Sequence, residues 1–296
     1  MKRKRSETLI SRQYEKKSLL AETLIRMKTN TGAVIGLAIL AVLILVMLIT
    51  TIFVPYSKIT AMNAEYRFAT PSAEYPFGND NLGRDLFLRV LYGSRYSLAV
   101  GFGAVAISFV VGTFLGAIAT YYGGILDEIV MRASDVLAAL PALLLGMVIV
   151  VVLGNSLTVL MIAVSVSAVP VFMRMARAAV ISVKDQEFVE ASHAIGMSNF
   201  RILFTQVLPN GLSPLIVLVS IRMGIAILDA ASLSFIGFGI AQPAPEWGAL
   251  VSAGRNFVTM APHVAFFPGA FIMLTVFACT LLGDGLRDAL DPKLKQ

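Results

Sequence analysis

Four long stretches of this 296-residue chain contain no Lys, Arg, Asp or Glu: residues 29–57, 96–126, 136–173 and 256–283. Each is longer than the roughly 20 residues that one helix needs to cross the hydrocarbon core of a bilayer. Hydrophobic residues make up 57% of the chain and charged residues 14%, whereas soluble domains average roughly 45 to 50% and about 25%. The chain is therefore predicted to be a multi-pass membrane protein.

Six membrane-spanning helices are expected from this pattern. The third stretch is long enough for two short spans, with a turn at 154–156 between them. A further apolar segment contains only Arg222 and Asp229, and a cost of roughly 2.5 to 3.5 kcal/mol for each still permits insertion. The ten-residue alternation of a membrane β-barrel is missing, so the expected fold class is an all-α polytopic membrane protein. The expected spans are 32–54, 97–121, 136–153, 157–174, 213–238 and 265–283.

The orientation is predicted from the basic residues. The first 31 residues hold nine Lys or Arg against three Glu, so the positive-inside rule places this end in the cytoplasm, and six spans return the C-terminus there. A basic arm that binds nucleic acid or lipid is the alternative for this tail. The expected organisation is a basic cytoplasmic tail at 1–31, a first span at 32–54, an extracytoplasmic loop with an amphipathic helix at 55–96, a five-helix core at 97–283 and a cytoplasmic tail at 284–296.

The stretch FGNDNLGRD at 77–85 resembles the phosphate-binding pattern G-x-x-x-x-G-K-[ST]. A base and an acid stand where the pattern requires Lys and Ser or Thr, and a carboxylate would repel phosphates. The stretch instead predicts a turn in which Asp80 or Asn81 caps an amphipathic helix and Asp85 pairs with Arg89. Such a helix would lie along the outer membrane surface. Its expected apolar stripe is Leu82, Leu86, Val90 and Leu91.

The longest predicted cytoplasmic loop, at 175–212, has the periodicity of a hairpin of two short helices. Asp185 and Ser198 are the expected N-caps, Gly196 suits a left-handed C-cap, and Pro209 ends the second helix. A DNA-reading helix-turn-helix has similar signals, but Lys184 and Arg201 are the only bases at 184–212, too few to neutralise phosphates. The expected apolar faces are Phe188, Ala191 and Ile195 on the first helix, and Phe200, Leu203, Phe204 and Val207 on the second.

This loop resembles the EAA motif, E-A-A-x3-G-x9-I-x-L-P, of the membrane subunits of ABC importers. Two positions depart from the motif, because Ser192 replaces the second alanine and Gln206 replaces the isoleucine. Both replacements keep helical character. The matching residues are Glu190, Ala191, Gly196, Leu208 and Pro209.

Longer segments of the chain look like the C-type permease subunit of dipeptide, oligopeptide and nickel importers. They occur in the order of that family, and the resemblance covers about residues 20–293. Several separate motifs make this resemblance more specific than the EAA loop alone. The segments are FGNDNLGRDLFLRVLYGSRYSL, MRASDVLAALPALLLG, EFVEASHAIGMSNFRILFTQVLPN, LDAASLSFIGFGIAQPAPEWGALV and LLGDGLRDALDP.

The resemblance implies a non-catalytic permease in a bacterial or archaeal plasma membrane, forming half of the pathway for peptides or a related solute such as a nickel chelate. It implies a second homologous permease, two cytoplasmic ATPases that bind Mg-ATP, and an extracytoplasmic solute-binding protein, with no nucleic acid and no cofactor on this chain. The plainer alternative is that Glu190 only solvates a helix and Gly196 only caps it. The implied ATPase-coupling residues are Glu190, Ala191, Ser192, Gly196, Leu208 and Pro209.

Four other residues are candidates for the transport pathway or its entrance. Arg222 and Asp229 are charges within a span, seven residues and roughly 10 Å apart on one helix. Lining of the pathway and helix packing both remain open for this pair. Glu246 and Trp247 lie in a predicted outer loop, where they could contact the binding protein or close the channel mouth, or Trp247 could anchor the membrane interface.

Two functions are rivals of transport driven by partner ATPases. An intramembrane aspartyl protease needs a G-x-G-D signature, but Leu281 stands at the first glycine, and no H-E-x-x-H metal motif is present. A self-sufficient secondary transporter would typically show internal repeats, and no clear repeat is visible. The secondary transporter remains the alternative function.

Two pairs of glycines are spaced for close helix packing. Gly32 and Gly36 lie in the first span, and Gly112 and Gly116 lie in the second. Small residues four apart let two helix backbones approach closely within a membrane. The pairs are therefore predicted to mark helix–helix contacts, and they carry no information about a substrate.

Overall fold

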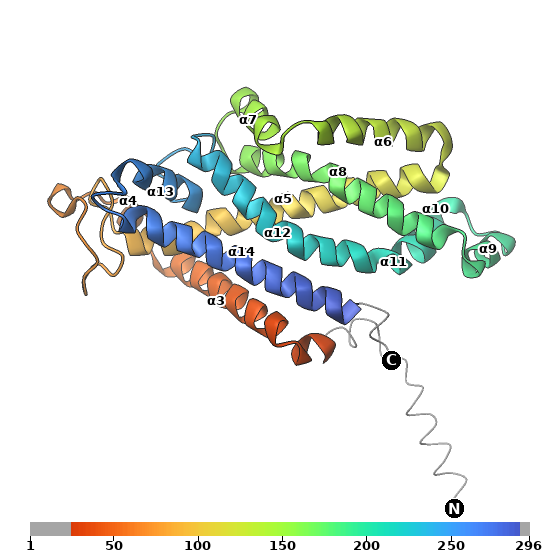
Figure 1. Ribbon diagram of the computed structural model, residues 1–296, viewed down its shortest axis with the longest axis horizontal. Coiled ribbons are helices and arrows are strands. Elements are labelled where there is room, and N and C mark those ends of the chain that lie inside the picture. The colour runs from red at the N-terminus through yellow and green to blue at the C-terminus, as the bar shows by residue number, and fades with distance from the viewer. Residues whose placement is uncertain (1–24, 291–296) are drawn as a thin grey trace, which may run out of the picture.

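The computed structural model describes residues 25–290, and this part of the chain is built of helices (Figure 1). The expected all-α membrane class is confirmed. Residues 1–24 and 291–296, which include most of the predicted basic tail, lie outside the described residues. The long helices are α3 (Thr31–Phe53), α5 (Leu86–Tyr122), α6 (Gly124–Ala139), α7 (Ala142–Leu153), α8 (Leu157–Lys184), α12 (Leu212–Phe235) and α14 (His263–Leu290). The short elements are α4 (Tyr56–Thr60), η1 (Ala64–Tyr66), α9 (Glu187–Ala194), α10 (Asn199–Ile202), η2 (Leu203–Val207), α11 (Leu208–Asn210), α13 (Trp247–Gly254) and η3 (Arg255–Phe257).

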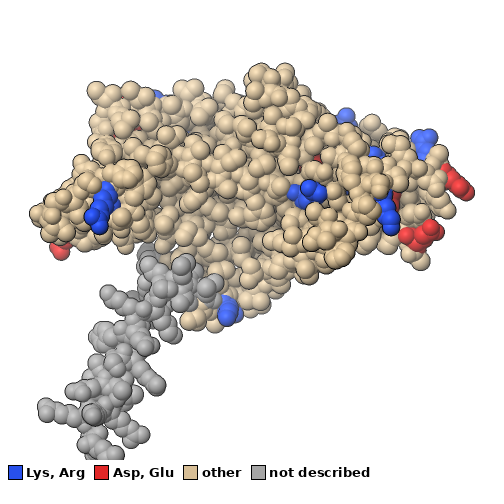
Figure 2. All heavy atoms as spheres, turned by 180° about the vertical axis from the view of Figure 1, so that it is seen from behind, with Lys and Arg blue, Asp and Glu red and all other residues tan. Residues whose placement is uncertain are grey.

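Five helices, α3, α5, α8, α12 and α14, are long and apolar enough to cross a membrane. They run along the long axis of the molecule (Figure 1). Large uncharged areas separate the charged side chains near the two ends of the molecule in Figure 2. This distribution matches a membrane-spanning bundle, because charged groups are costly in the hydrocarbon region.

The span expected at 136–153 is not one continuous helix, because α6 and α7 are two helices bent by 92° at the break between them. Pro141 directly precedes α7, and Leu140 has an extended backbone with φ −83° and ψ 133°. Proline disfavours the helical conformation of the residue before it, which explains the break. The bent pair counts as a sixth span only if both helices are taken together. The region before Asp135, expected to be a loop, is helical and forms most of α6.

The separate amphipathic helix expected near residue 86 is also wrong, because these residues form the first turns of the 37-residue helix α5. Leu86 and Val90 are fully buried and therefore do not face a membrane surface. Asp85 caps α5 by accepting a hydrogen bond from the Leu88 amide at 3.1 Å and does not pair with Arg89. The helix continues to Gly123, whose φ of +69° ends it.

Glycine contacts hold the bundle together as the sequence predicted. A Cβ atom added to Gly112 of α5 would lie 2.7 Å from the carbonyl oxygen of Val169 in α8, and Gly116 lies against the backbone of Met173. On α3, a Cβ atom at Gly36 would lie 2.6 Å from the carbonyl oxygen of Ala278 in α14. The helix backbones therefore touch where a side chain would separate them.

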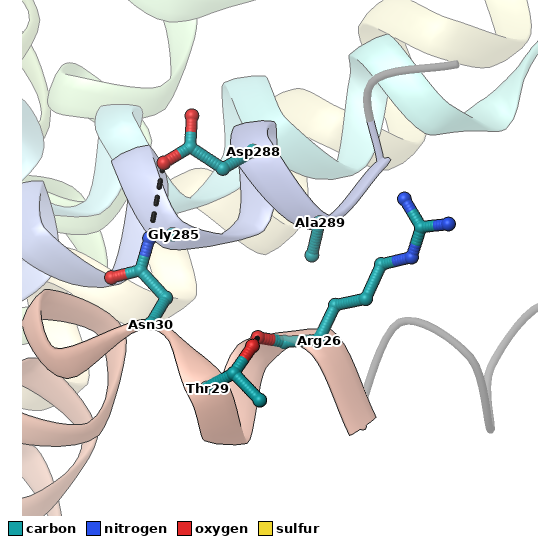
Figure 3. Close-up of a pocket in the computed structure, with 6 residues that line it drawn as sticks. All are labelled: Arg26, Thr29, Asn30, Gly285, Asp288 and Ala289. Carbon is teal, nitrogen blue, oxygen red and sulfur yellow. Dashed lines mark hydrogen bonds between the residues drawn. The ribbon is translucent and has the colours of Figure 1, made fainter. Parts of the chain in front are cut away.

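A side-chain contact joins the start of α3 to the end of α14 (Figure 3). The Asn30 side chain caps α3 through the Ala33 amide and donates a hydrogen bond to Asp288 of α14 at 3.0 Å. A hollow of about 340 Å³ lies between them, lined in part by Arg26 and Gly285. The contact joins segments that are 258 residues apart in the sequence.

Replacing Gly112 with Ala should destabilise the protein by about 1 to 3 kcal/mol, because the new methyl group overpacks the contact between α5 and α8. Thermal unfolding in detergent, followed by the fluorescence of Trp247, the only Trp of the chain, measures the change. Gly269→Ala in α14 is the control, because no atom lies within 4 Å of its added Cβ. Alanine there should be neutral or stabilising. Equal melting temperatures for the two variants would contradict the packing role of Gly112.

Candidate functional site

A short hairpin projects from one end of the bundle, where α9 and α10 lie beyond the ends of α5 and α8 (Figure 1). Gly196 forms the turn with a φ of +82°, a conformation that glycine adopts without strain, as the sequence predicted. Its amide donates to the His193 carbonyl oxygen at 2.9 Å. The N-cap of α9 is Gln186, not Asp185, while Ser198 is the N-cap of α10. Neither cap residue makes a side-chain hydrogen bond to its helix.

The face of α9 that packs on the protein is not the expected one. Val189 and Ser192 are buried, whereas Phe188 and Ile195, expected to be inward, are 38% and 78% exposed. On the second helix Leu203 and Val207 are buried as expected, but Phe200 is 61% exposed. The hairpin therefore presents apolar side chains to its surroundings. Glu190 and Ala191 lie on the exposed side with them.

A separate apolar cluster fixes the hairpin to the bundle. It joins Val189 of α9 to Ala117 of α5, to Val180 and Val183 of α8 and to the second half of the hairpin. The Tyr121 hydroxyl of α5 also lies 3.4 Å from Nε2 of His193. These contacts attach α9 to the ends of α5 and α8.

The return segment of the hairpin contains a π-helix at Leu203–Val207. The Leu208 amide donates to the Leu203 carbonyl oxygen, five residues back. Pro209 has no amide hydrogen to donate to the preceding turn, which favours this wider local winding. Pro209 does not end the helix as expected, because it lies inside α11, and the chain bends at Gly211 before α12.

An ion pair that the sequence did not reveal holds α6 against α8. Arg177 Nη2 lies 2.8 Å from Asp127 Oδ2, and its Nε lies 3.2 Å from the same oxygen. The Thr120 hydroxyl of α5 donates to Asp127 at 3.1 Å. Three helices thus meet at one carboxylate close to the hairpin. The only signal in the sequence was an excess of acids at 127–135.

Arg222 and Asp229 are both half-buried, and among residues 25–290 neither forms an ion pair. The structure therefore keeps Arg222 and Asp229 apart. This agrees with the prediction from their spacing of seven residues. Near them, a groove of about 650 Å³ opens at the hairpin end of α12. Its lining includes Ser213, Val217 and Ile221 of α12 and Arg287 of α14.

Glu246 and Trp247 do not lie on an exposed loop, so contact with a binding protein through their side chains is not supported. They are 1% and 0% exposed. Glu246 caps α13 by accepting hydrogen bonds from the Gly248 and Ala249 amides at 2.9 and 2.8 Å. Burial raises the pKa of its carboxyl group, and these hydrogen bonds oppose the rise. Trp247 Nε1 donates to the Val90 carbonyl oxygen of α5 at 2.8 Å, so an interface anchor is also wrong.

The stretch that resembles a phosphate loop forms a buried charge cluster at the end of the molecule opposite the hairpin. Asp80 accepts a hydrogen bond from Arg84 Nε at 2.6 Å, and Arg89 Nε lies 3.5 Å from the same carboxylate. Both guanidinium groups are at most 2% exposed. Arg89 also donates to the Ile59 carbonyl oxygen at 3.1 Å. Asp80 thus pairs with two arginines and caps no helix, while Asp85 takes the capping role.

No three His, Cys, Asp or Glu side chains come together as a metal site in the part of the chain that the structure describes. The ion pairs of residues 25–290 are the Asp80 cluster, Arg177 with Asp127, and Arg174 with Asp135. The hairpin instead presents an exposed apolar surface, and a groove lies beside α12.

Two family models match the chain. The model described as binding-protein-dependent transport system inner membrane component matches residues 108–296, and the model for the N-terminal TM domain of oligopeptide transport permease C matches residues 18–71. The first match includes the hairpin and α12.

Similar proteins have been named in several bacteria. The dipeptide transport system permease protein DppC of Alkalihalophilus pseudofirmus is 45% identical over 96% of this chain and 93% of that protein. The glutathione transport system permease protein GsiD is 45% identical in Pectobacterium atrosepticum, over 76% of this chain and 75% of that protein. GsiD of Escherichia coli O157:H7 is 42% identical over 86% of each chain.

A solved structure shares the fold. A chain of the MetNI methionine ABC transporter, in an inward-facing conformation, superposes with a TM-score of 0.57 and 20% sequence identity. The match covers 70% of this chain and 98% of that chain. At this identity the similarity shows the fold alone.

Replacing Asp80 with Asn should destabilise the protein by about 3 to 5 kcal/mol, because two buried arginines lose their carboxylate. The melting temperature in detergent measures the change. The matched control is Asp135→Asn, which removes an exposed ion pair with Arg174 at 3.8 Å and should cost about 0 to 1 kcal/mol. A melting temperature for Asp80→Asn equal to that of the control would show that the cluster is not essential to the fold.

Proposed function

Because the chain belongs to the family of binding-protein-dependent transport system inner membrane components, we propose that it forms half of a transmembrane pathway for short peptides. Membership makes it a multi-pass inner-membrane permease of an ABC importer. The peptide cargo is the proposal, and it is supported by two relatives whose names specify a dipeptide and glutathione. A cytoplasmic location of the hairpin, derived from the basic N-terminal tail, belongs to the same proposal.

The proposed assembly contains a second homologous permease, two ATPases that bind Mg-ATP and an extracytoplasmic solute-binding protein. The exposed surface of the hairpin supports an ATPase partner. Phe188, Ile195 and Phe200 are exposed beside Glu190 and Ala191. The small side chain of Ala191 lets a partner approach this apolar patch closely. The carboxylate of Glu190 can pair with a basic side chain of that partner. The single observation that carries this proposal is that the hairpin leaves Phe188, Ile195 and Phe200 exposed instead of packing them on its own bundle.

The same hairpin can transmit movement to the membrane helices. Its inward side is packed on α5 and α8 through Val189, Val180 and Val183. A displacement of α9 by closure of the ATPases would therefore pull on the ends of two long helices. Coupling requires that docking differ in energy between the two states of the transporter. In this proposal Gly196 keeps the hairpin tight, while Leu208 and Pro209 set the direction in which the chain returns to α12.

Glu190→Ala and Gly196→Pro should each reduce the ATP hydrolysis that a loaded binding protein stimulates, by about tenfold or more. Glu190→Ala removes the exposed charge of the docking surface. Gly196→Pro cannot adopt a φ of +82°. Hydrolysis is measured on this chain reconstituted with its partner permease and both ATPases, with and without peptide-loaded binding protein. The control is Glu74→Ala, an exposed acid near the end of the molecule opposite the hairpin.

Two results would contradict the proposal in different ways. Stimulated hydrolysis at wild-type level in both hairpin variants would remove the hairpin from coupling. Peptide uptake by this chain alone in liposomes, with no response to the ATPases, would instead support the self-sufficient secondary transporter.

A further inference from the structure

One face of α12 is left open by the other helices of the chain. Ile221, Ile225 and Leu228 lie on this face and are 37%, 38% and 45% exposed. Arg222 and Asp229 line up with Ile225 along the edge of this face, because residues spaced by three, four and seven share one side of a helix. Both side chains are only half-buried.

The two charges on this face are separate and opposite. Among residues 25–290, Arg222 has no acidic partner within ion-pair distance and Asp229 has no basic one. Charged residues within a membrane span usually face the interior of a helix bundle or a water-filled cavity, because lipid contact is costly. The open face of α12 is therefore unsuited to lipid. In the proposed importer it would face the pathway between the two permeases.

The spacing of the charges matches a short peptide. Seven residues correspond to roughly 10 Å along a helix axis, and an extended chain rises about 3.3 to 3.6 Å per residue. A free peptide of two or three residues carries an ammonium group and a carboxylate at its two ends. A guanidinium group binds a carboxylate through two parallel hydrogen bonds, and an aspartate accepts hydrogen bonds from an ammonium group.

We infer that Arg222 and Asp229 contact the two charged ends of a short zwitterionic peptide during its passage, with the carboxylate at Arg222 and the amine at Asp229. This inference rests on the proposed function and assigns this chain a part in selecting the cargo. The residues are not placed to pair with each other, which leaves each free for the peptide.

The groove beside α12 continues this path toward the hairpin. It begins at Ile221, the neighbour of Arg222, and is lined by Val217 and Ser213 along the helix. Arg287 of α14 also lines it. A peptide released from Asp229 would therefore meet apolar surface for its side chains and a second guanidinium group for its carboxylate.

The test uses the complete transporter in proteoliposomes, with trialanine, N-acetyl-trialanine and trialanine amide as cargo. Uptake per ATP hydrolysed is measured with the binding protein saturated by each peptide, so that its own selectivity does not enter. Arg222→Gln should reduce the preference for trialanine over its amide by about tenfold, the size of one charge-assisted contact. Asp229→Asn should reduce the preference for trialanine over the acetylated peptide by a similar factor.

The matched control is Ser232→Ala on the same face, because the Ser232 hydroxyl already donates to the Leu228 carbonyl oxygen of its own helix at 2.7 Å. Both preferences should stay at the wild-type value in this variant. Wild-type preferences in Arg222→Gln and Asp229→Asn would overturn the inference, and so would failure of either variant to copurify with the partner subunits, since that places the charges in packing. Stimulation of the wild-type complex by loaded binding protein tests the proposed function separately.

Discussion

Direct contact between the backbones of α5 and α8 is the interaction on which most other features depend. Gly112 and Gly116 permit it, because any side chain there would meet α8. The contact aligns the ends of both helices, where the cluster around Val180 and Val183 receives the hairpin. It also places Arg177 of α8 where Asp127 of α6 can bind it. Close helix packing thus positions the elements that would carry movement.

The two ends of the molecule differ in which side chains they bury and which they expose. At one end, charged and polar groups are buried and held by contacts within the chain, as with Asp80 and its arginines and with Glu246 at the start of α13. At the hairpin end, apolar side chains such as Phe188 and Ile195 are exposed. The first end keeps these charged groups inside the chain, whereas exposed apolar surface at the second is typical of a site that a partner covers.

The open face of α12 lies between these two ends and gives the chain a third kind of surface. Its apolar residues would tolerate lipid, but Arg222 and Asp229 would not. In an importer built from two permeases, such a face is best placed toward the shared pathway. Selection of cargo and response to ATP would then be served by different helices of the same subunit, linked through the packing of α12 on α8 and α5.

The sequence alone determined the membrane class, the approximate positions of most spans, the close-packing glycines and the left-handed turn at Gly196. These follow from composition, local periodicity and backbone freedom, which need no knowledge of neighbouring segments. The motifs of the chain also indicated its family. The prolines show that local sequence does not decide where a helix is interrupted. Pro141 separates helix α6 from α7, whereas Pro170 and Pro268 lie inside continuous helices.

Only the tertiary structure decided which charges meet and which faces are covered. The sequence contains two Asp–Arg pairs with a spacing of four, Asp80 with Arg84 and Asp85 with Arg89. The spacing alone does not show which of them forms an ion pair. The start of α5 at Leu86 makes Asp85 a cap and turns Arg89 toward Asp80. Likewise, the packing of the hairpin on α5 and α8 selected Val189 as the inward residue. Such choices depend on contacts between distant segments, which local sequence patterns do not encode.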